Sequence, residues 1–83
     1  MKLTVRYFAS IREVLGPTET LDVPADVTVG GVRDALIARG GVHATALARN
    51  RALRSALNHQ MCDDAVAVPV GAEVAFFPPV TGG

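Results

Sequence analysis

The sequence predicts a small α+β domain with a mixed sheet, and three features support this fold class. Residues 2–9 and residues 73–77, near the two ends, show the period of two that is typical of strands. Between them, residues 29–39 carry apolar side chains at the three- and four-residue spacing of a helix. A length of 83 residues provides for one modest core, which excludes a two-domain enzyme or a barrel enzyme.

The first half of the chain predicts a strand, a short first helix, a second strand and the main helix. The buried face of the first strand is expected to carry Leu3, Val5 and Tyr7. Ser10 and Glu13 have the spacing of a capping box, so Ser10 is expected to cap a short helix that Gly16 and Pro17 end. Residues 18–23 alternate again and form the second predicted strand.

The main helix is predicted over residues 29–39, with Thr28 as its N-cap. Its apolar stripe consists of Val29, Val32 and Leu36. Gly30 and Gly31 each cost about 1 kcal/mol relative to alanine in a helix, so the first turn is expected to fray.

The second half is harder to assign. Residues 42–57 are ambiguous, since their alanine, leucine and arginine content favours a helix by propensity alone. Asn58 and His59 are expected to turn the chain into residues 60–62, and residues 66–70 to form a short extended run. The last predicted strand, residues 73–77, must end at Pro78 and Pro79, which cannot donate ladder hydrogen bonds.

Composition excludes several classes of function. Eight basic and eight acidic side chains balance, which argues against a partner such as nucleic acid or an anionic membrane. No apolar run approaches the roughly 20 residues of a membrane span, and no signal-peptide pattern follows Met1. Cys62, His43 and His59 lack metal-ligand spacing, so no metal site is expected. A single cysteine fits a reducing compartment, and the predicted location is the cytoplasm.

The C-terminal residues carry the strongest functional pattern. The sequence predicts a folded domain over residues 1–77 and an extended tail over residues 78–83. Two terminal glycines have no side chains, so such a tail can enter a narrow channel and present the α-carboxylate of Gly83. A frayed terminus that happens to end in glycine is the alternative interpretation.

Residues 6–16 and especially residues 71–83, GAEVAFFPPVTGG, resemble the ubiquitin-like sulfur carriers, the family that includes the small subunit of molybdopterin synthase. The resemblance implies the β-grasp fold, in which the main helix packs across a mixed sheet and the first and last strands are parallel neighbours. It also implies a strand near residues 54–58, because this fold would otherwise lose an edge of its sheet. It also implies that the chain is a non-catalytic, sulfur-donating subunit that binds no cofactor of its own.

The same resemblance implies a reaction at Gly83. A ubiquitin-activating-type adenylyltransferase would use ATP to adenylate Gly83, and sulfur would then convert it to a thiocarboxylate. The tail would enter the large subunit of molybdopterin synthase, in a heterotetramer of two small and two large subunits, and give sulfur to cyclic pyranopterin monophosphate. Gly82 would provide access, and the spacer would consist of Pro78, Pro79, Val80 and Thr81.

Strand parity predicts where a partner docks. Phe8 and Phe77 are expected on the sheet face opposite the core, beside each other, with Met61 joining them as a partner-binding surface. The alternative is that loops or residues 42–57 cover these rings. Arg49, Arg51 and Arg54 could meet an acidic partner, although a solvated face is the favoured interpretation. Cys62 is favoured as a small core residue over a persulfide relay.

Two other functions remain open at this point. The chain could carry sulfur for thiamine-thiazole or cysteine synthesis, with the same chemistry at Gly83. It could also be a ubiquitin-like protein modifier or a plain interaction module; a modifier needs the terminal carboxyl group and a module does not.

Overall fold

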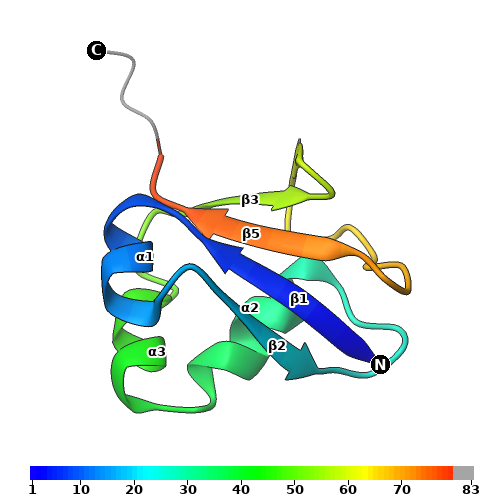
Figure 1. The fold of residues 1–83 in the computed structure, drawn as a ribbon, viewed down its shortest axis with the longest axis horizontal. Coiled ribbons are helices and arrows are strands. Elements are labelled where there is room, and N and C mark those ends of the chain that lie inside the picture. Colours follow the sequence, from blue (N-terminus) through cyan, green and yellow to red (C-terminus); the bar gives the residue numbers. More distant parts are fainter. Residues whose placement is uncertain (80–83) are drawn as a thin grey trace.

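A computed structural model describes residues 1–79 of the chain, which alternate between strands and short helices (Figure 1). The strands are β1 (Lys2–Tyr7), β2 (Thr18–Asp22), β3 (Arg54–Leu57), β4 (Gln60–Cys62) and β5 (Glu73–Phe77). The helices are α1 (Ala9–Leu15), α2 (Val29–Ile37) and α3 (Gly41–Ala46). The predicted α+β class is confirmed, and α3 adds a third helix to the two that the sequence predicted.

The five strands form one mixed sheet in the order β2-β1-β5-β3-β4. β1 and β5 are parallel, with Val5 opposite Val74 and Tyr7 opposite Phe76, whereas the other neighbouring pairs are antiparallel. The two strands that are farthest apart in sequence therefore lie side by side, as predicted, and β5 occupies the centre of the sheet.

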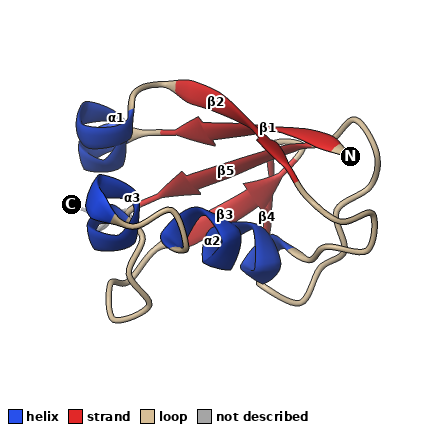
Figure 2. Cartoon of the chain, turned by 90° about the horizontal axis from the view of Figure 1, so that it is seen from below, coloured by secondary structure: helices blue, strands red, loops and turns tan. Residues whose placement is uncertain are grey.

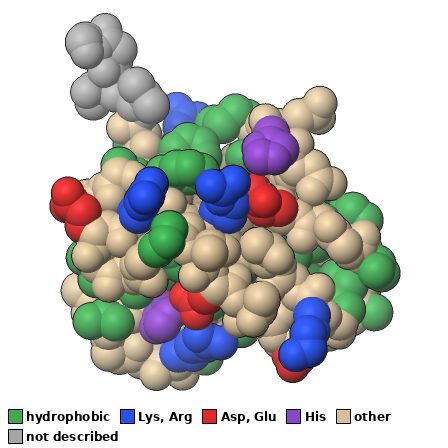
Figure 3. Space-filling model, viewed as in Figure 1, with side chains coloured by type: hydrophobic (Ala, Val, Ile, Leu, Met, Phe, Trp, Pro, Cys, Tyr) green, Lys and Arg blue, Asp and Glu red, His purple; other side chains and the backbone are tan. Residues whose placement is uncertain are grey.

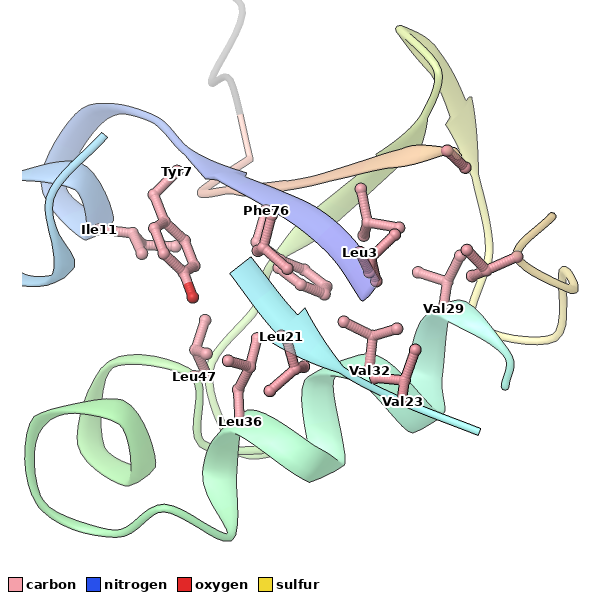
Figure 4. Packing of buried hydrophobic residues seen from close by; sticks show 14 of the residues in the cluster. Leu3, Tyr7, Ile11, Leu21, Val23, Val29, Val32, Leu36, Leu47 and Phe76 are labelled. Atoms are coloured by element: carbon pink, nitrogen blue, oxygen red, sulfur yellow. The ribbon is translucent and has the colours of Figure 1, made fainter. Parts of the chain in front are cut away.

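α2 crosses one side of the sheet with α3 beside it, and α1 stands at the end of the sheet next to the end of β1 (Figure 2). The inward side chains of β1 and β5 meet the α2 stripe in the core (Figure 4). The core includes Leu3, Val5, Tyr7, Ile11, Leu21, Val29, Val32, Leu36, Leu47, Val74 and Phe76. This two-layer arrangement, with parallel terminal strands at the centre of the sheet, is the expected β-grasp architecture.

The predicted capping box of the first helix is wrong. α1 begins at Ala9, so Ser10 lies inside the first turn and Phe8 occupies the N-cap position without a side-chain hydrogen bond. Phe8 remains extended because its amide donates to the Phe76 carbonyl and so continues the pairing with β5. The helix therefore starts directly where strand pairing stops, before Ser10 can act as a cap.

Thr28 caps α2 as predicted: its hydroxyl oxygen accepts from the Gly31 amide at 3.1 Å. The expected fraying is not what the structure shows, because the Val29 amide donates to the Val66 carbonyl and the Gly30 amide to the Asp64 carbonyl. A Cβ on Gly30 would lie 2.9 Å from the Cβ of Asp64, so glycine permits this close approach. The first turn of α2 is thus held by the loop after β4.

The ambiguous residues 42–57 divide between helix and strand. α3 takes their first part, and the predicted strand is confirmed as β3. Asn58 and His59 form the predicted tight turn to β4, both with positive φ (48° and 70°). The short extended run predicted within residues 66–70 forms an isolated antiparallel bridge between Ala67 and Thr28 and no strand of the sheet. Its backbone bonds to the start of α2 and not to the sheet.

Candidate functional site at the end of β5 and on the open face of the sheet

The predicted tail begins at a fixed point. β5 is hydrogen-bonded between β1 and β3, Phe76 is completely buried, and Phe77 pairs in register with Arg54. Pro78 and Pro79 follow directly and belong to no strand. Phe77, the last residue of β5, is therefore held by strand pairing, and this fixes the position from which the tail begins.

The other predicted tail residues, Val80, Thr81, Gly82 and Gly83, lie outside the described residues. Their assignment as spacer, access residue and reactive end remains a prediction.

Phe8 and Phe77 meet on the sheet face opposite the helices. Their ring centroids are 6.3 Å apart at an interplanar angle of 82°, an edge-to-face contact. Phe8 is 38% exposed and Phe77 is half-buried, so the described residues do not cover the pair. The predicted neighbourhood of the two rings is confirmed; their role in partner binding is still a prediction.

Other side chains on the same open face extend from the Phe8–Phe77 pair across the neighbouring strands. The row across the strands consists of Arg6, Ala75, Ala56 and Met61. Met61 is 60% exposed, and the Arg6 guanidinium lies over the Phe8 ring, 5.5 Å from its centroid. Figure 3 shows hydrophobic side chains gathered on this face, with Lys or Arg side chains beside them. We call Phe8, Phe77, Met61, Ala56 and Ala75 the aromatic patch.

A polar cluster that the sequence analysis missed lies on the helix side of β1 and β2. The Tyr7 hydroxyl donates to Glu19 Oε2 at 2.7 Å, His43 Nε2 lies 2.8 Å from the same oxygen, and Arg39 donates to Oε1 at 2.6 Å. The register of β1 with β2 could have revealed this cluster. Glu19 is opposite Val5, which is an inward position, so its carboxylate points toward α3. The cluster ties β1, β2 and α3 together.

The environment shifts the pKa of both acidic groups of this cluster, Tyr7 and Glu19. Burial, followed by the hydrogen bond to Glu19, raises the pKa of the Tyr7 hydroxyl above its ordinary value. Burial alone would also raise the pKa of Glu19, but hydrogen bonds with Tyr7 and His43 and the charges of His43 and Arg39 outweigh it. The Glu19 pKa is therefore lowered, and its carboxylate is charged at neutral pH.

The predicted arginine group is not one surface. Arg49 donates to Asp34 at 2.9 Å, to Asp64 at 2.6 Å and to the Gly30 carbonyl, and the hydrogen bonds to the two carboxylates raise its pKa. Arg51 and Arg54 are exposed.

Arg33 is a buried arginine that the sequence pattern did not reveal. Its side chain is 6% exposed and donates hydrogen bonds to the backbone carbonyls of three residues after α3. These acceptors are Leu47, Ala48 and Arg51.

Cys62 is half-buried against the core. Burial, then the charges of Asp63 and Asp64, raise the pKa of its thiol. A protonated thiol is a poor nucleophile, which agrees with the favoured interpretation of Cys62 as a small packing residue.

Within residues 1–79, no group of three His, Cys, Asp or Glu side chains is arranged to hold a metal ion. No helix in this part of the chain is long and apolar enough to span a membrane.

Comparisons with known proteins agree with the fold and extend to the tail. A protein of Haemophilus influenzae named molybdopterin synthase sulfur carrier subunit is 39% identical over 82 residues, 98% of this chain and 99% of that protein. The crystal structure of small archaeal modifier protein 1 of Haloferax volcanii matches with a TM-score of 0.77 and 30% identity, over 95% of this chain and 98% of that one.

The Helicobacter pylori complex of subunits 1 and 2 of molybdopterin-converting factor contains a chain with the same fold. Its TM-score is 0.68 at 21% identity, and the match covers 100% of both chains. The model of the ThiS family matches residues 5–83, which include the Gly-Gly terminus. The chain therefore belongs to the ThiS family.

Proposed function

We propose that this protein is the sulfur-carrier subunit of a molybdopterin synthase and that Gly83 is its reactive residue. One observation carries the proposal: the family match continues to the last residue, directly after a central strand that fixes the start of the tail. The 39% identical relative with the corresponding name supports this choice among sulfur pathways. Thiazole and cysteine synthesis have no comparable support.

The proposed chemistry overcomes the low reactivity of a carboxylate. The Gly83 carboxylate attacks the α-phosphate of ATP, which is bound by an adenylyltransferase, and pyrophosphate leaves. A sulfur nucleophile such as hydrosulfide then attacks the acyl carbon, AMP departs with the carboxyl oxygen, and Gly83 becomes a thiocarboxylate. Catalytic acid–base groups and the ATP site belong to the activating partner in this scheme.

The thiocarboxylate then delivers its sulfur inside the large subunit. Cyclic pyranopterin monophosphate receives two sulfur atoms to form the dithiolene of molybdopterin, so two thiocarboxylated carriers are used for each molecule of product. Hydrolysis of the acyl group returns Gly83 to a carboxylate. A heterotetramer with two small and two large subunits is the proposed assembly, and the association of subunits 1 and 2 in the Helicobacter pylori complex supports pairing with a second kind of subunit.

The aromatic patch is the proposed docking site for the large subunit. Phe8 and Phe77 adjoin the end of β5, so a protein that covers them also lies where it can receive the tail. Aromatic side chains with neighbouring apolar area are typical of the energetic centre of an interface.

Intact-mass measurement tests the chemistry. The protein is incubated with ATP, its adenylyltransferase and sulfide, and we expect a species about 16 Da heavier, because sulfur replaces one oxygen at an activated acyl group. A chain without Gly83 serves as the control and should show no such change. An unchanged mass with an adenylyltransferase that charges another carrier would reject the proposal.

The similarity to small archaeal modifier protein 1 favours one second candidate, a ubiquitin-like protein modifier. Gly83 would then form an isopeptide bond with a lysine of a target protein. Lys2 is the only lysine of this chain, so chains of copies joined by isopeptide bonds could grow only there. Peptide mapping of conjugates from cells distinguishes the two, because a modifier leaves a branched peptide in which its own C-terminal segment is joined to a target lysine, and a pure carrier leaves none.

A further inference from the structure

Arg54, on the open face of the sheet, has no ion pair among the described residues. On β1 and β2, the outward Lys2 lies opposite the outward Asp22, at the end of β1 away from Phe8. Arg6 pairs with Glu73 of β5 at 3.7 Å. Arg54 of β3 remains, exposed and without an ion pair within residues 1–79.

Arg54 lies at the part of this face where docking is proposed. It is the register partner of Phe77, so both side chains emerge from neighbouring strands on the same side of the sheet. Phe77 in turn contacts Phe8. A partner that covers the two rings therefore approaches the Arg54 guanidinium as well.

Covering Phe77 has an electrostatic consequence. An arginine that loses water without gaining an acceptor destabilises a complex, whereas a carboxylate offers a planar, bidentate match to its guanidinium. Arg6 cannot supply compensation because it is also positive, and Glu73 is already paired with it.

We propose that the docking partner presents a carboxylate side chain to Arg54 beside an apolar surface that covers Phe8 and Phe77. This inference rests on the proposed function, in which that partner is the large subunit of molybdopterin synthase. The ion pair between Arg54 and this carboxylate would lie at the edge of the interface, where complementary charge raises the association rate and favours the correct partner.

The test measures association with the large subunit of the same organism in low and high salt. Arg54→Glu should slow association about tenfold at low salt, because it replaces an attraction to the partner's carboxylate by a repulsion. Arg54→Gln should slow association less, because it removes the attraction and adds no repulsion. Both differences should shrink in 1 M salt, where the Debye length is about 3 Å. A lysine replacing the partner's carboxylate should restore fast association with Arg54→Glu.

Arg51→Glu is the matched control. Arg51 is also exposed and has the same charge, but it lines a depression together with Val14 of α1 and residues of α3. Equal association rates for Arg54→Glu and Arg51→Glu would overturn the inference and leave the proposed function intact. Failure of the unmodified chain to bind the large subunit would overturn both. Thermal unfolding of each variant confirms that the fold is retained.

Discussion

Glu19 shows how a single half-buried carboxylate can connect several elements. Its two oxygens interact with Tyr7 of β1, His43 of α3 and Arg39, which follows α2. A buried tyrosine hydroxyl needs a hydrogen-bond acceptor, and Glu19 supplies it without leaving any described buried side-chain polar atom unpaired. The α3 end of the molecule therefore depends on the ionised form of one residue.

Glu19→Gln should lower the free energy of unfolding by about 1–2 kcal/mol at pH 7, because charged hydrogen bonds are lost. The native pKa of Glu19 is below its ordinary value of 4.5, so its charged form stabilises the fold above that pH. This contribution disappears as the pH falls through the native pKa. Urea unfolding between about pH 7 and pH 3 should show the wild-type advantage shrinking toward acid pH.

Glu13→Gln provides the comparison, since it removes the same charge from an exposed position on α1. A Glu19→Gln deficit that stays constant down to about pH 3 would contradict the assigned ionic role.

Phe77→Asp tests the aromatic patch. The side chain is only half-buried and its neighbour Phe76 fills the core, so the fold should persist. Affinity for the large subunit should fall about 30-fold or more, the effect of losing a hot spot worth roughly 2 kcal/mol. Titration calorimetry measures the change, and Val70→Asp, at a site that is 83% exposed, controls for the added charge. Unchanged binding of Phe77→Asp would show that the docking face lies elsewhere.

At the scale of elements, the start of α2 is fixed by tertiary contact and not by helix propensity. The loop after β4 accepts hydrogen bonds from the first two amides of the helix, and Arg49 links Asp64 of that loop to Asp34 of α2. The glycine at position 30 allows the loop backbone to approach this closely.

Gly30→Ala separates the two explanations. In an isolated helix this change stabilises by about 1 kcal/mol. In the folded protein the new methyl group would lie 2.9 Å from Asp64 Cβ and 3.2 Å from the Asp64 carbonyl oxygen, so the loop must move. We expect a net loss of about 1–3 kcal/mol, typical of overpacking, in urea unfolding. A more stable variant would mean that the loop yields without cost.

The elements that could be predicted from the sequence are those with a local pattern. β1 and β5 have the period of two, α2 has its apolar stripe and its Thr28 cap, and the Asn58-His59 turn has suitable residue types. The capping box was wrong, and the partner of the extended run at residues 66–70 could not be predicted, because both depend on distant hydrogen bonds. Pairing of Phe8 with β5 displaced the capping box, and residues 66–68 pair with the start of α2.

The candidate site divides in the same way. Strand parity correctly placed Phe8 and Phe77 together, because alternation needs only local information. The sequence could not separate Arg49, Arg51 and Arg54, since their difference lies in the acceptors that distant segments bring near. Arg33 and Glu19 were missed for the same reason: a buried charge is explained only by its three-dimensional partners.

At the scale of the whole molecule, folding and the proposed chemistry use different parts of the chain. The core is assembled from residues 3–76, and the central strand ends at Phe77, before the proposed reactive end. Docking is assigned to the sheet face and sulfur transfer to Gly83. Changes at one should therefore leave the other largely intact.

Deleting Gly83 tests this separation. Removal of a residue beyond the core should leave the midpoint of thermal unfolding unchanged and affinity for the large subunit within a few-fold, because the aromatic patch is complete. Thiocarboxylate formation, followed by intact mass, and molybdopterin formation in the reconstituted synthase should both be lost. Phe77→Asp should show the reverse at the docking step, with weak binding by a chain that keeps its terminal glycine. Retained molybdopterin formation after the deletion would mean that sulfur is carried elsewhere, and a lower unfolding midpoint would mean that the terminus is part of the fold.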